Sequence, residues 1–155
     1  MLTIGDIAPA FELAADDGSI IKLSDYAGQR LLIFFYPKAA TSGCTTQACG
    51  FRDNYPAIEA NGAAVIGISR DSVEKLANWR AKEGFPYSLL SDPEHEIAEL
   101  YGVWGERSMY GRKYMGIVRS HFVVDADGKL EDVQYKISPK NSIKQGVKQL
   151  TINNE

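Results

Sequence analysis

The two cysteines of this chain, Cys44 and Cys49, are the side chains best suited to do chemistry. They lie in the stretch FFYPKAATSGCTTQACGFRD, where an apolar run and Pro37 lead into a predicted helix. A thiol reacts as its thiolate, yet an ordinary cysteine is mostly protonated at neutral pH. The free backbone N–H groups at a helix start favour an anion, so we expect Cys44 to be a reactive thiolate. The alternative is a small, buried and inert side chain.

The spacing of the two cysteines limits how they can pair. Within one α-helix, residues five apart differ by about 140° around the axis and ~7.5 Å along it, which places their Cα atoms roughly 8–9 Å apart. A disulfide needs Cα atoms closer than ~7 Å. Either Cys44 and Cys49 never pair, or the first turns of the helix unwind when they do. The second possibility fits a thiol that is oxidised first and then captured, and it does not fit a permanent cross-link.

Two other uses of a cysteine pair fit the sequence less well. A structural zinc site needs four Cys or His ligands, commonly with CxxC spacing. The only histidines, His95 and His121, lie far from the cysteines in the sequence. A thioredoxin-type disulfide exchanger normally carries CxxC, whereas this pair is CxxxxC.

The composition is that of an ordinary globular protein with a small net negative charge. The 155 residues are 45% apolar and 24% charged, with a net charge of −3 at pH 7, which suits one domain over residues 1–155. Nucleic acids and anionic membranes attract basic surfaces, so we expect neither as a partner. No apolar run approaches the roughly 20 residues of a membrane helix, and MLTIGDIAPAF does not resemble a signal peptide. We expect a cytoplasmic protein, where a cysteine pair is more often catalytic than structural.

Hydrophobic periodicity and turn signals predict an α/β fold. The runs 31–36 and 63–69 are apolar on both faces, as in buried parallel strands. Helical crossovers demand parallel neighbours and hairpins add antiparallel strands, so we expect a mixed central β-sheet with helices on both faces and an N-terminal β-hairpin. The predicted elements are a hairpin at 11–13 and 20–23, strands at 31–36, 63–69 and 87–90, helices at 45–60, 72–83, 93–101 and 141–150, a loop at 102–116, and a hairpin at 117–125 and 130–135.

The segment 37–44 carries the pattern PxxxTxxC, which is typical of the peroxiredoxins. Its surroundings resemble the peroxiredoxin Q, or bacterioferritin comigratory protein, subfamily, whose members often read FYPKDDTPGCTxEACxFRD. The resemblance extends over nearly the whole chain, through the opening GDxAPxFxL, SRDS at 69–72, SDP at 91–93 and YGRKYMGIVRSHF at 110–122. The combined pattern is far more specific than PxxxTxxC alone.

The resemblance implies a thioredoxin-like fold and a thiol peroxidase that reduces hydrogen peroxide and organic hydroperoxides without a metal or prosthetic group. It implies that Cys44 is the peroxidatic cysteine, oxidised to sulfenic acid, and that Cys49 resolves it as an intramolecular disulfide. Thr41 and Arg119 would complete the active site, and Pro37 would shape its loop. Thioredoxin or a similar dithiol protein would be the reductant, and the subfamily resemblance favours a monomer.

Arg119 is also the cationic partner that the residues themselves suggest. It interrupts an apolar strand pattern, and a buried guanidinium needs an anion: the Cys44 thiolate or, in a structural role, Asp53 or a glutamate. Its planar fork suits a thiolate and a peroxide oxygen together. We expect the backbone N–H groups of Gly43 and Cys44 to help stabilise charge as it moves from sulfur to the leaving oxygen. The Thr41 hydroxyl would donate to the sulfur and accept from the peroxide.

Three features depart from the subfamily pattern or leave their role open. Ser42 replaces a common proline, and as a helix cap it would place Cys44 at the second helical position. His121 stands where threonine is frequent, and we expect a packed surface histidine. The aromatic and basic loop 102–116 would wall the active site, dock a reductant, or be a solvated loop pinned by its rings.

Two other functions remain compatible with the two thiols. A protein-disulfide oxidoreductase would act on protein disulfides without peroxide. A thiol redox sensor would pass its oxidation to a partner protein and would show no multiple turnover with thioredoxin.

Overall fold

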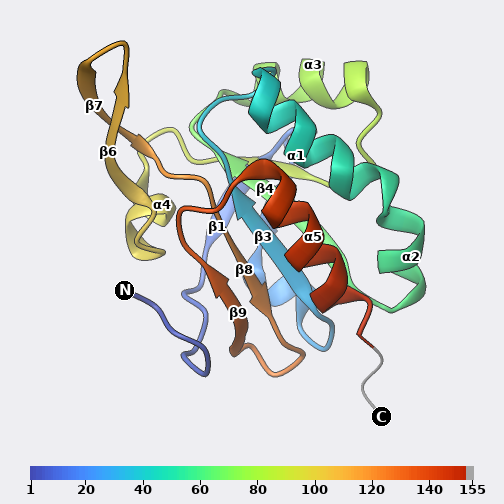
Figure 1. The fold of residues 1–155 in the computed structure, drawn as a ribbon. Coiled ribbons are helices and arrows are strands. Elements are labelled where there is room, and N and C mark those ends of the chain that lie inside the picture. Colours follow the sequence, from blue (N-terminus) through green and yellow to red (C-terminus); the bar gives the residue numbers. More distant parts are fainter. Residues whose placement is uncertain (153–155) are drawn as a thin grey trace.

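The computed structural model describes residues 1–152 as a mixed sheet covered by helices (Figure 1). Seven strands lie in the order β2-β1-β5-β4-β3-β8-β9. The parallel strands are β3 (Leu31–Phe35), β4 (Ala64–Ser69) and β5 (Leu89–Ser91). The strands that pair in antiparallel fashion are β1 (Glu12–Ala15), β2 (Ile20–Lys22), β8 (Ser120–Val124) and β9 (Leu130–Gln134). The expected mixed sheet and N-terminal hairpin are confirmed.

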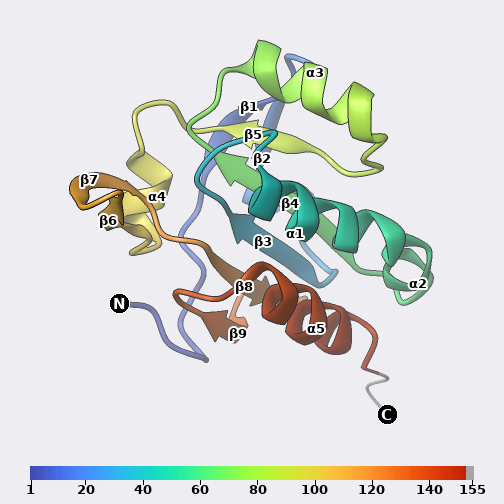
Figure 2. The same cartoon turned by 45° about the horizontal axis from the view of Figure 1, so that its top comes forward.

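Helices cover both faces of the sheet, as expected. One face packs against α1 (Ser42–Asp53), α2 (Tyr55–Ala60), α3 (Val73–Glu83) and α5 (Pro139–Leu150). The other packs against α4 (Glu96–Leu100) and the N-terminal segment, and a short 3₁₀ helix, η1 (Leu23–Tyr26), follows β2. Figure 2 shows α1 and α5 side by side over the sheet. Between residues 1 and 152, no helix combines the length and apolar character needed to cross a bilayer.

The central strand β3 builds a core on each face and delivers the chain to the reactive segment. Its side chains alternate, so that Ile33 and Phe35 join the core beneath α4, whereas Leu32 and Phe34 join the core beneath α1. All four are fully buried. Because α1 follows directly from the carboxyl end of β3, Cys44 lies at that end of the parallel strands, where functional residues of open α/β sheets gather.

The helix predicted at 45–60 is wrong in two respects. It begins earlier, at Ser42 with Thr41 as its N-cap, and it is broken into α1 and α2 at Asn54. Pro56 has no N–H to continue the first helix, and the Asn54 side chain caps α1 by donating to the Gly50 carbonyl over 2.8 Å. Helix α4 is also shorter than the predicted 93–101, since residues 93–95 form a turn before it.

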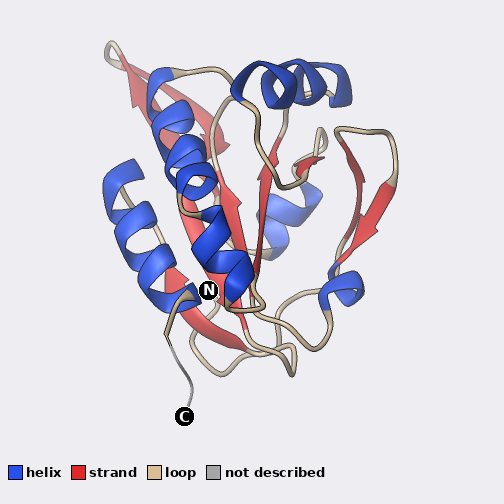
Figure 3. Cartoon of the chain, turned by 90° about the vertical axis from the view of Figure 1, so that its right-hand side faces the viewer, coloured by secondary structure: helices blue, strands red, loops and turns tan. Residues whose placement is uncertain are grey.

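The segment 102–116 is a β-hairpin rather than a loop. It consists of β6 (Trp104–Met109) and β7 (Arg112–Ile117), which pair only with each other. The turn residues Tyr110 and Gly111 have φ of 52° and 77°, as two-residue hairpin turns require. Its strands carry mostly polar and exposed side chains, so no buried face signalled them in the sequence. The hairpin projects beyond the central sheet (Figure 3).

The strand predicted at 117–125 is divided by the residues that lead from the hairpin into the sheet. β7 ends at Ile117 and β8 begins at Ser120, so Val118 and Arg119 belong to neither strand. The Val118 N–H donates to the Val103 carbonyl, and the Ile137 N–H donates to the Arg119 carbonyl. Arg119 is thereby fixed at the crossing point between the hairpin and the central sheet.

Helix α5 can approach the sheet closely only because residue 146 is glycine. A Cβ atom there would lie 2.6 Å from Leu32 and 2.8 Å from Phe51. We expect Gly146→Ala to lower the free energy of unfolding by about 1–3 kcal/mol, because overpacking outweighs the gain in helix propensity. Urea denaturation measures the change. The control is Gln145→Ala at an exposed neighbouring position, which should alter stability by less than about 0.5 kcal/mol. If Gly146→Ala changed stability no more than this control, or raised it, α5 would not depend on the close approach.

Candidate active site

Cys44 lies in the first turn of α1 with its side chain buried and facing a cleft. It is the third helical residue rather than the second, because Thr41 and not Ser42 is the N-cap. The helix start offers unsatisfied N–H groups and the positive end of the peptide dipoles, which favour a thiolate there. The cleft has a volume of about 580 Å³, and Pro37, Thr41, Cys44 and Arg119 all line it.

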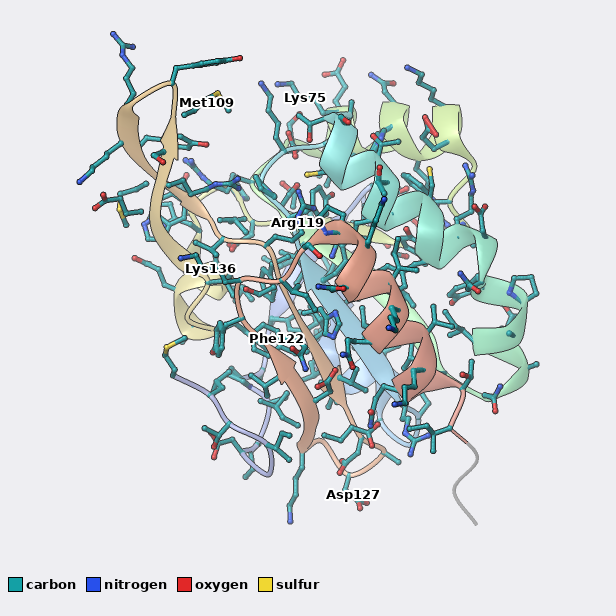
Figure 4. The ribbon with its side chains drawn as sticks, in the orientation of Figure 1. Lys75, Met109, Arg119, Phe122, Asp127 and Lys136 are labelled. Carbon is teal, nitrogen blue, oxygen red and sulfur yellow. The ribbon has the colours of Figure 1, made fainter. Side chains whose placement is uncertain are left out.

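Arg119 brings its guanidinium directly to this sulfur. One terminal nitrogen donates to the Cys44 Sγ atom over 3.4 Å, and the other donates to the Gln47 side-chain oxygen over 2.7 Å. Arg119 does not form the alternative salt bridge to Asp53, since Asp53 pairs with Arg52 instead. Figure 4 shows Arg119 beside the start of α1.

Gly43 allows this close approach. A Cβ atom at that position would lie 3.1 Å from the nearer guanidinium nitrogen of Arg119, which is tighter than ordinary van der Waals contact. A side chain there would push the cation away from the sulfur, so the glycine makes room for the arginine.

Thr41 is at the cleft, but its hydroxyl does not donate to the sulfur as expected. It donates to the Lys38 carbonyl over 2.7 Å. Thr41 has the extended backbone of an N-cap residue, with φ −83° and ψ 159°, but its side chain makes no capping hydrogen bond. Ser42 is exposed at the first helical position, a place where proline is also favoured.

The loop from residue 37 to 41 is held by the neighbouring strand end. The Ala39 N–H donates to the Asp71 carboxylate over 2.8 Å, and the Ser69 hydroxyl donates to the same oxygen over 2.7 Å. Ala40 adopts a left-handed conformation with φ 65°. These contacts fix the turn between Pro37, which ends the apolar strand, and the start of α1.

Cys49 lies two turns below the helix start, half-buried and unpaired with Cys44. Its thiol donates to the Glu83 carboxylate at the end of α3 over 3.5 Å. Arg52 holds that residue by donating to the Glu83 carbonyl over 2.7 Å. Burial and the hydrogen bond to Glu83 raise the pKa of the Cys49 thiol, so Cys49 rests as a thiol.

The β6–β7 hairpin forms one wall of the cleft, which settles one of the roles left open for residues 102–116. It contributes Arg107, Met109, Tyr114 and Met115. Arg70 and Lys75 line the cleft as well, Lys75 from α3, and Figure 4 shows Met109 and Lys75 at the upper ends of the hairpin and of α3. The entrance therefore combines apolar side chains with several cations.

A larger hollow of about 800 Å³ lies at the amino end of β3, beneath the β1–β2 hairpin. Its lining includes Ala8, Phe11 and Tyr26 but no cysteine or histidine. Thiol chemistry therefore belongs to the smaller cleft.

His121 is not a surface residue, and this expectation is wrong. Its side chain is fully buried on β8, where one ring nitrogen lies 2.8 Å from the Ser142 hydroxyl and the other 3.0 Å from the Asp132 carboxylate. Sequence reasoning also missed Gln47, which is fully buried and bonds both Arg119 and Ser142. Its spacing of three from Cys44 on a helix was the available signal, because such residues share a face.

Comparison with known proteins identifies the family. The model of the AhpC/TSA family matches residues 4–133. The chain belongs to the AhpC/TSA family. Peroxiredoxin Bcp of Escherichia coli K12 is 52% identical over 132 residues, which cover 85% of each chain. Peroxiredoxin Bcp of Bacillus subtilis is 41% identical over 149 residues, which cover 96% of this chain and 95% of the relative.

Solved structures agree with this family. A peroxiredoxin Q of Xylella fastidiosa matches with a TM-score of 0.90 and 29% identity, over 97% of this chain and 96% of the other. The bacterioferritin comigratory protein of Xanthomonas campestris, described for its alkyl peroxide reduction activity, matches with a TM-score of 0.84 and 33% identity, over 90% and 89%. The chain is thus a peroxiredoxin of the Q, or Bcp, group: a peroxidase with the thioredoxin-like fold.

The carboxylate beside the second thiol of this peroxiredoxin gives a testable pKa effect. We expect Glu83→Gln to lower the pKa of Cys49, because the substitution removes the negative charge beside the thiol and replaces a charged acceptor by a neutral amide, while burial remains. Alkylation of Cys49 by iodoacetamide, followed over pH in a Cys44→Ser background, should be faster at neutral pH. Glu74→Gln, an exposed change on the same helix, is the control. Unchanged or slower alkylation in Glu83→Gln would show that Glu83 does not hold Cys49 in its protonated form.

Proposed function

We propose that Cys44 is the peroxidatic cysteine of this enzyme. The Cys44 thiolate attacks one oxygen of the hydroperoxide, the O–O bond breaks, and the other oxygen leaves as hydroxide or alkoxide and takes a proton to become water or an alcohol. The sulfur is oxidised to sulfenic acid, and the peroxide is reduced by two electrons. Cysteine supplies the electrons, so the step needs no metal or prosthetic group.

The observation that carries this proposal is the 3.4 Å contact between the Arg119 guanidinium and the Cys44 sulfur at a helix start. The cation and the free N–H groups stabilise the thiolate before reaction. As charge moves to the departing oxygen, the same donors remain in place to receive it, which is the most effective form of electrostatic catalysis. The N–H groups of Gly43 and Cys44 lie in the same helical turn, and Thr41 and Pro37 shape the entrance to it.

Cys49 then resolves the sulfenic acid. Its thiol condenses with oxidised Cys44, an S–S bond forms, and the sulfenic oxygen leaves as water. Helix geometry keeps the two residues too far apart for this bond, so α1 must unwind in its first turns. The structure has both cysteines unpaired on an intact helix, which corresponds to the reduced enzyme ready for peroxide.

A dithiol protein, thioredoxin or one like it, completes the cycle. One of its thiolates attacks the Cys44–Cys49 disulfide, and its second thiol releases the mixed disulfide, so two electrons pass to the enzyme. The substrates are hydrogen peroxide and organic hydroperoxides. Met109, Met115 and Ile117 give the cleft an apolar side for an alkyl group, and the similar Xanthomonas campestris protein is described as reducing alkyl peroxides. The enzyme works as a monomer of one domain, residues 1–155, in the cytoplasm, where dithiol reductants are available.

Single substitutions separate the proposed roles of the two cysteines. We expect Cys44→Ser to abolish peroxide consumption, whereas Cys49→Ser still takes up one oxygen as sulfenic acid and then stops. Mass spectrometry after one equivalent of peroxide locates the oxidised sulfur and, in the wild type, the Cys44–Cys49 link. Oxidation of Cys49 in the Cys44→Ser variant would reverse the assignment. Activity on protein disulfides without peroxide, or no repeated turnover with thioredoxin, would favour a disulfide oxidoreductase or a redox sensor.

The role of Arg119 is tested by removing its charge. We expect Arg119→Gln to slow oxidation of Cys44 by about 10²–10³-fold, the usual cost of losing one preorganised donor. Rapid mixing with hydrogen peroxide, followed by thiol quantification, measures the second-order rate. Arg107→Gln removes another cleft arginine, whose guanidinium bonds the Ile117 carbonyl and not the sulfur, and should have a far smaller effect. Equal losses in the two variants would mean that general positive charge, and not the contact to sulfur, drives the reaction.

A further inference from the structure

A continuous chain of hydrogen bonds leads from the active site to the edge strand β9, along the face of the sheet that α1 and α5 cover. It runs from Arg119 to Gln47 over 2.7 Å, and from Gln47 to Ser142 over 2.8 Å. It continues from Ser142 to His121 over 2.8 Å and from His121 to Asp132 over 3.0 Å. The side chains of Gln47, Ser142 and His121 are fully buried. The five residues come from α1, α5, β8, β9 and the β7–β8 connection.

The hydrogen bonds of this chain can all run in one direction, from Arg119 to Asp132. Arg119 can only donate, so Gln47 turns its oxygen toward the guanidinium and its N–H group toward the Ser142 oxygen. In the tautomer with its proton on Nε2, His121 accepts at Nδ1 from the Ser142 hydroxyl and donates to Asp132. A cation lies at one end and a carboxylate at the other, an order in which each bond polarises and strengthens the next.

The carboxylate end is well supplied with donors. Asp132 also accepts from the Gln134 amide over 2.9 Å, and its side chain is 13% exposed. Burial opposes ionisation of Asp132, but the hydrogen bonds from His121 and Gln134 outweigh it and lower the pKa of the carboxyl group. The anion needed to fix the direction of the chain is therefore present at neutral pH.

Gln47 connects this chain to both steps of the reaction. It lies on α1 between the two cysteines, three residues after Cys44 and two before Cys49. Its oxygen holds one arm of the guanidinium whose other arm contacts the sulfur. Unwinding α1 as far as Cys49 would carry Gln47 away from both Arg119 and Ser142. The same two hydrogen bonds thus orient the cation and stabilise the folded helix.

We propose that Ser142, His121 and Asp132 are positioning residues, which act through Gln47 to hold Arg119 against Cys44 and to keep α1 folded until the sulfur is oxidised. This inference rests on the proposed roles of Cys44 and Arg119. A purely structural role, in which buried polar groups only satisfy one another, predicts changes in stability alone. The positioning role predicts opposite changes in two successive rates: slower oxidation of Cys44 and faster formation of the disulfide.

Ser142→Ala breaks the chain at its centre with the smallest change in volume. In a Cys49→Ser background, which isolates the first step, we expect hydrogen peroxide to oxidise Cys44 about tenfold more slowly, as small misplacements of catalytic groups commonly cost. With Cys49 present, disulfide formation after oxidation should become about fivefold faster. Unwinding of α1 then no longer breaks the Gln47–Ser142 hydrogen bond, which contributes ~1 kcal/mol. Rapid-quench mass spectrometry resolves the two steps, and urea denaturation reports stability separately.

Asp132→Asn tests the far end of the chain with a substitution that keeps the size of the side chain, and urea denaturation reports its effect on stability. Gln134 keeps the new amide oxygen, so the amide nitrogen faces His121 and forces its proton onto Nδ1. The Ser142–His121 bond then reverses. We expect the same opposite changes in the two rates as for Ser142→Ala. Asp127→Asn makes the same chemical change at an exposed position in the β8–β9 turn and should leave both rates unaltered.

Three outcomes would overturn the proposal. The first is an oxidation rate within twofold of the parent in both Ser142→Ala and Asp132→Asn. The second is a parallel fall of both rates, which general loosening of the fold would produce. The third is an equal response to Asp127→Asn. Failure of the underlying function is distinguishable, because it would show as a parent enzyme that is not oxidised at Cys44 at all.

Discussion

Positive charge reaches the Cys44 sulfur through its contact with the Arg119 guanidinium, and several local features of the fold serve that contact. Positive potential stabilises a thiolate at neutral pH. This fold brings two sources of positive potential to the Cys44 sulfur. One is the start of α1, which follows directly from the central strand β3. The other arrives from the opposite end of the chain, at the junction of the β6–β7 hairpin and β8. Gly43 supplies the space in which the two meet.

The proposed cycle places two opposed requirements on helix α1. Its first turn must be folded to direct N–H groups at the Cys44 sulfur, and it must unwind for Cys49 to reach Cys44. The helix is short, because it ends before Asn54, and polar side chains hold it in addition to its apolar contacts. Gln47 bonds Arg119 and Ser142, and Cys49 bonds Glu83. Cys44, Ala48 and Phe51 pack in the core beneath the helix, so unwinding as far as Cys49 also gives up the burial of Ala48.

The β6–β7 hairpin forms one wall of the cleft that leads to the thiol. It pairs with no strand of the central sheet and is attached through Trp104, which stacks on His95 at 3.9 Å and lies beneath the Arg70 guanidinium. Its inner side supplies Arg107, Met109 and Met115 to the cleft. A surface of cations and flexible thioethers suits peroxides of different sizes, because methionine adapts its shape to what it contacts.

The sequence alone predicted the mixed sheet, a helix after Pro37 and Cys44 as the candidate reactive thiol. Those features follow from local signals: the apolar run before Pro37, the turn residues, and the spacing of Cys44 and Cys49 along one helix. It also indicated Arg119, since a cation within an apolar pattern needs an anion. Three features became visible only in the folded chain: the Thr41 hydrogen bond, the hairpin at residues 104–117, and the burial of His121 with Gln47 and Ser142. The physical reason is that these depend on which polar groups meet across elements far apart in the chain, and periodicity within one element carries no information about its partners.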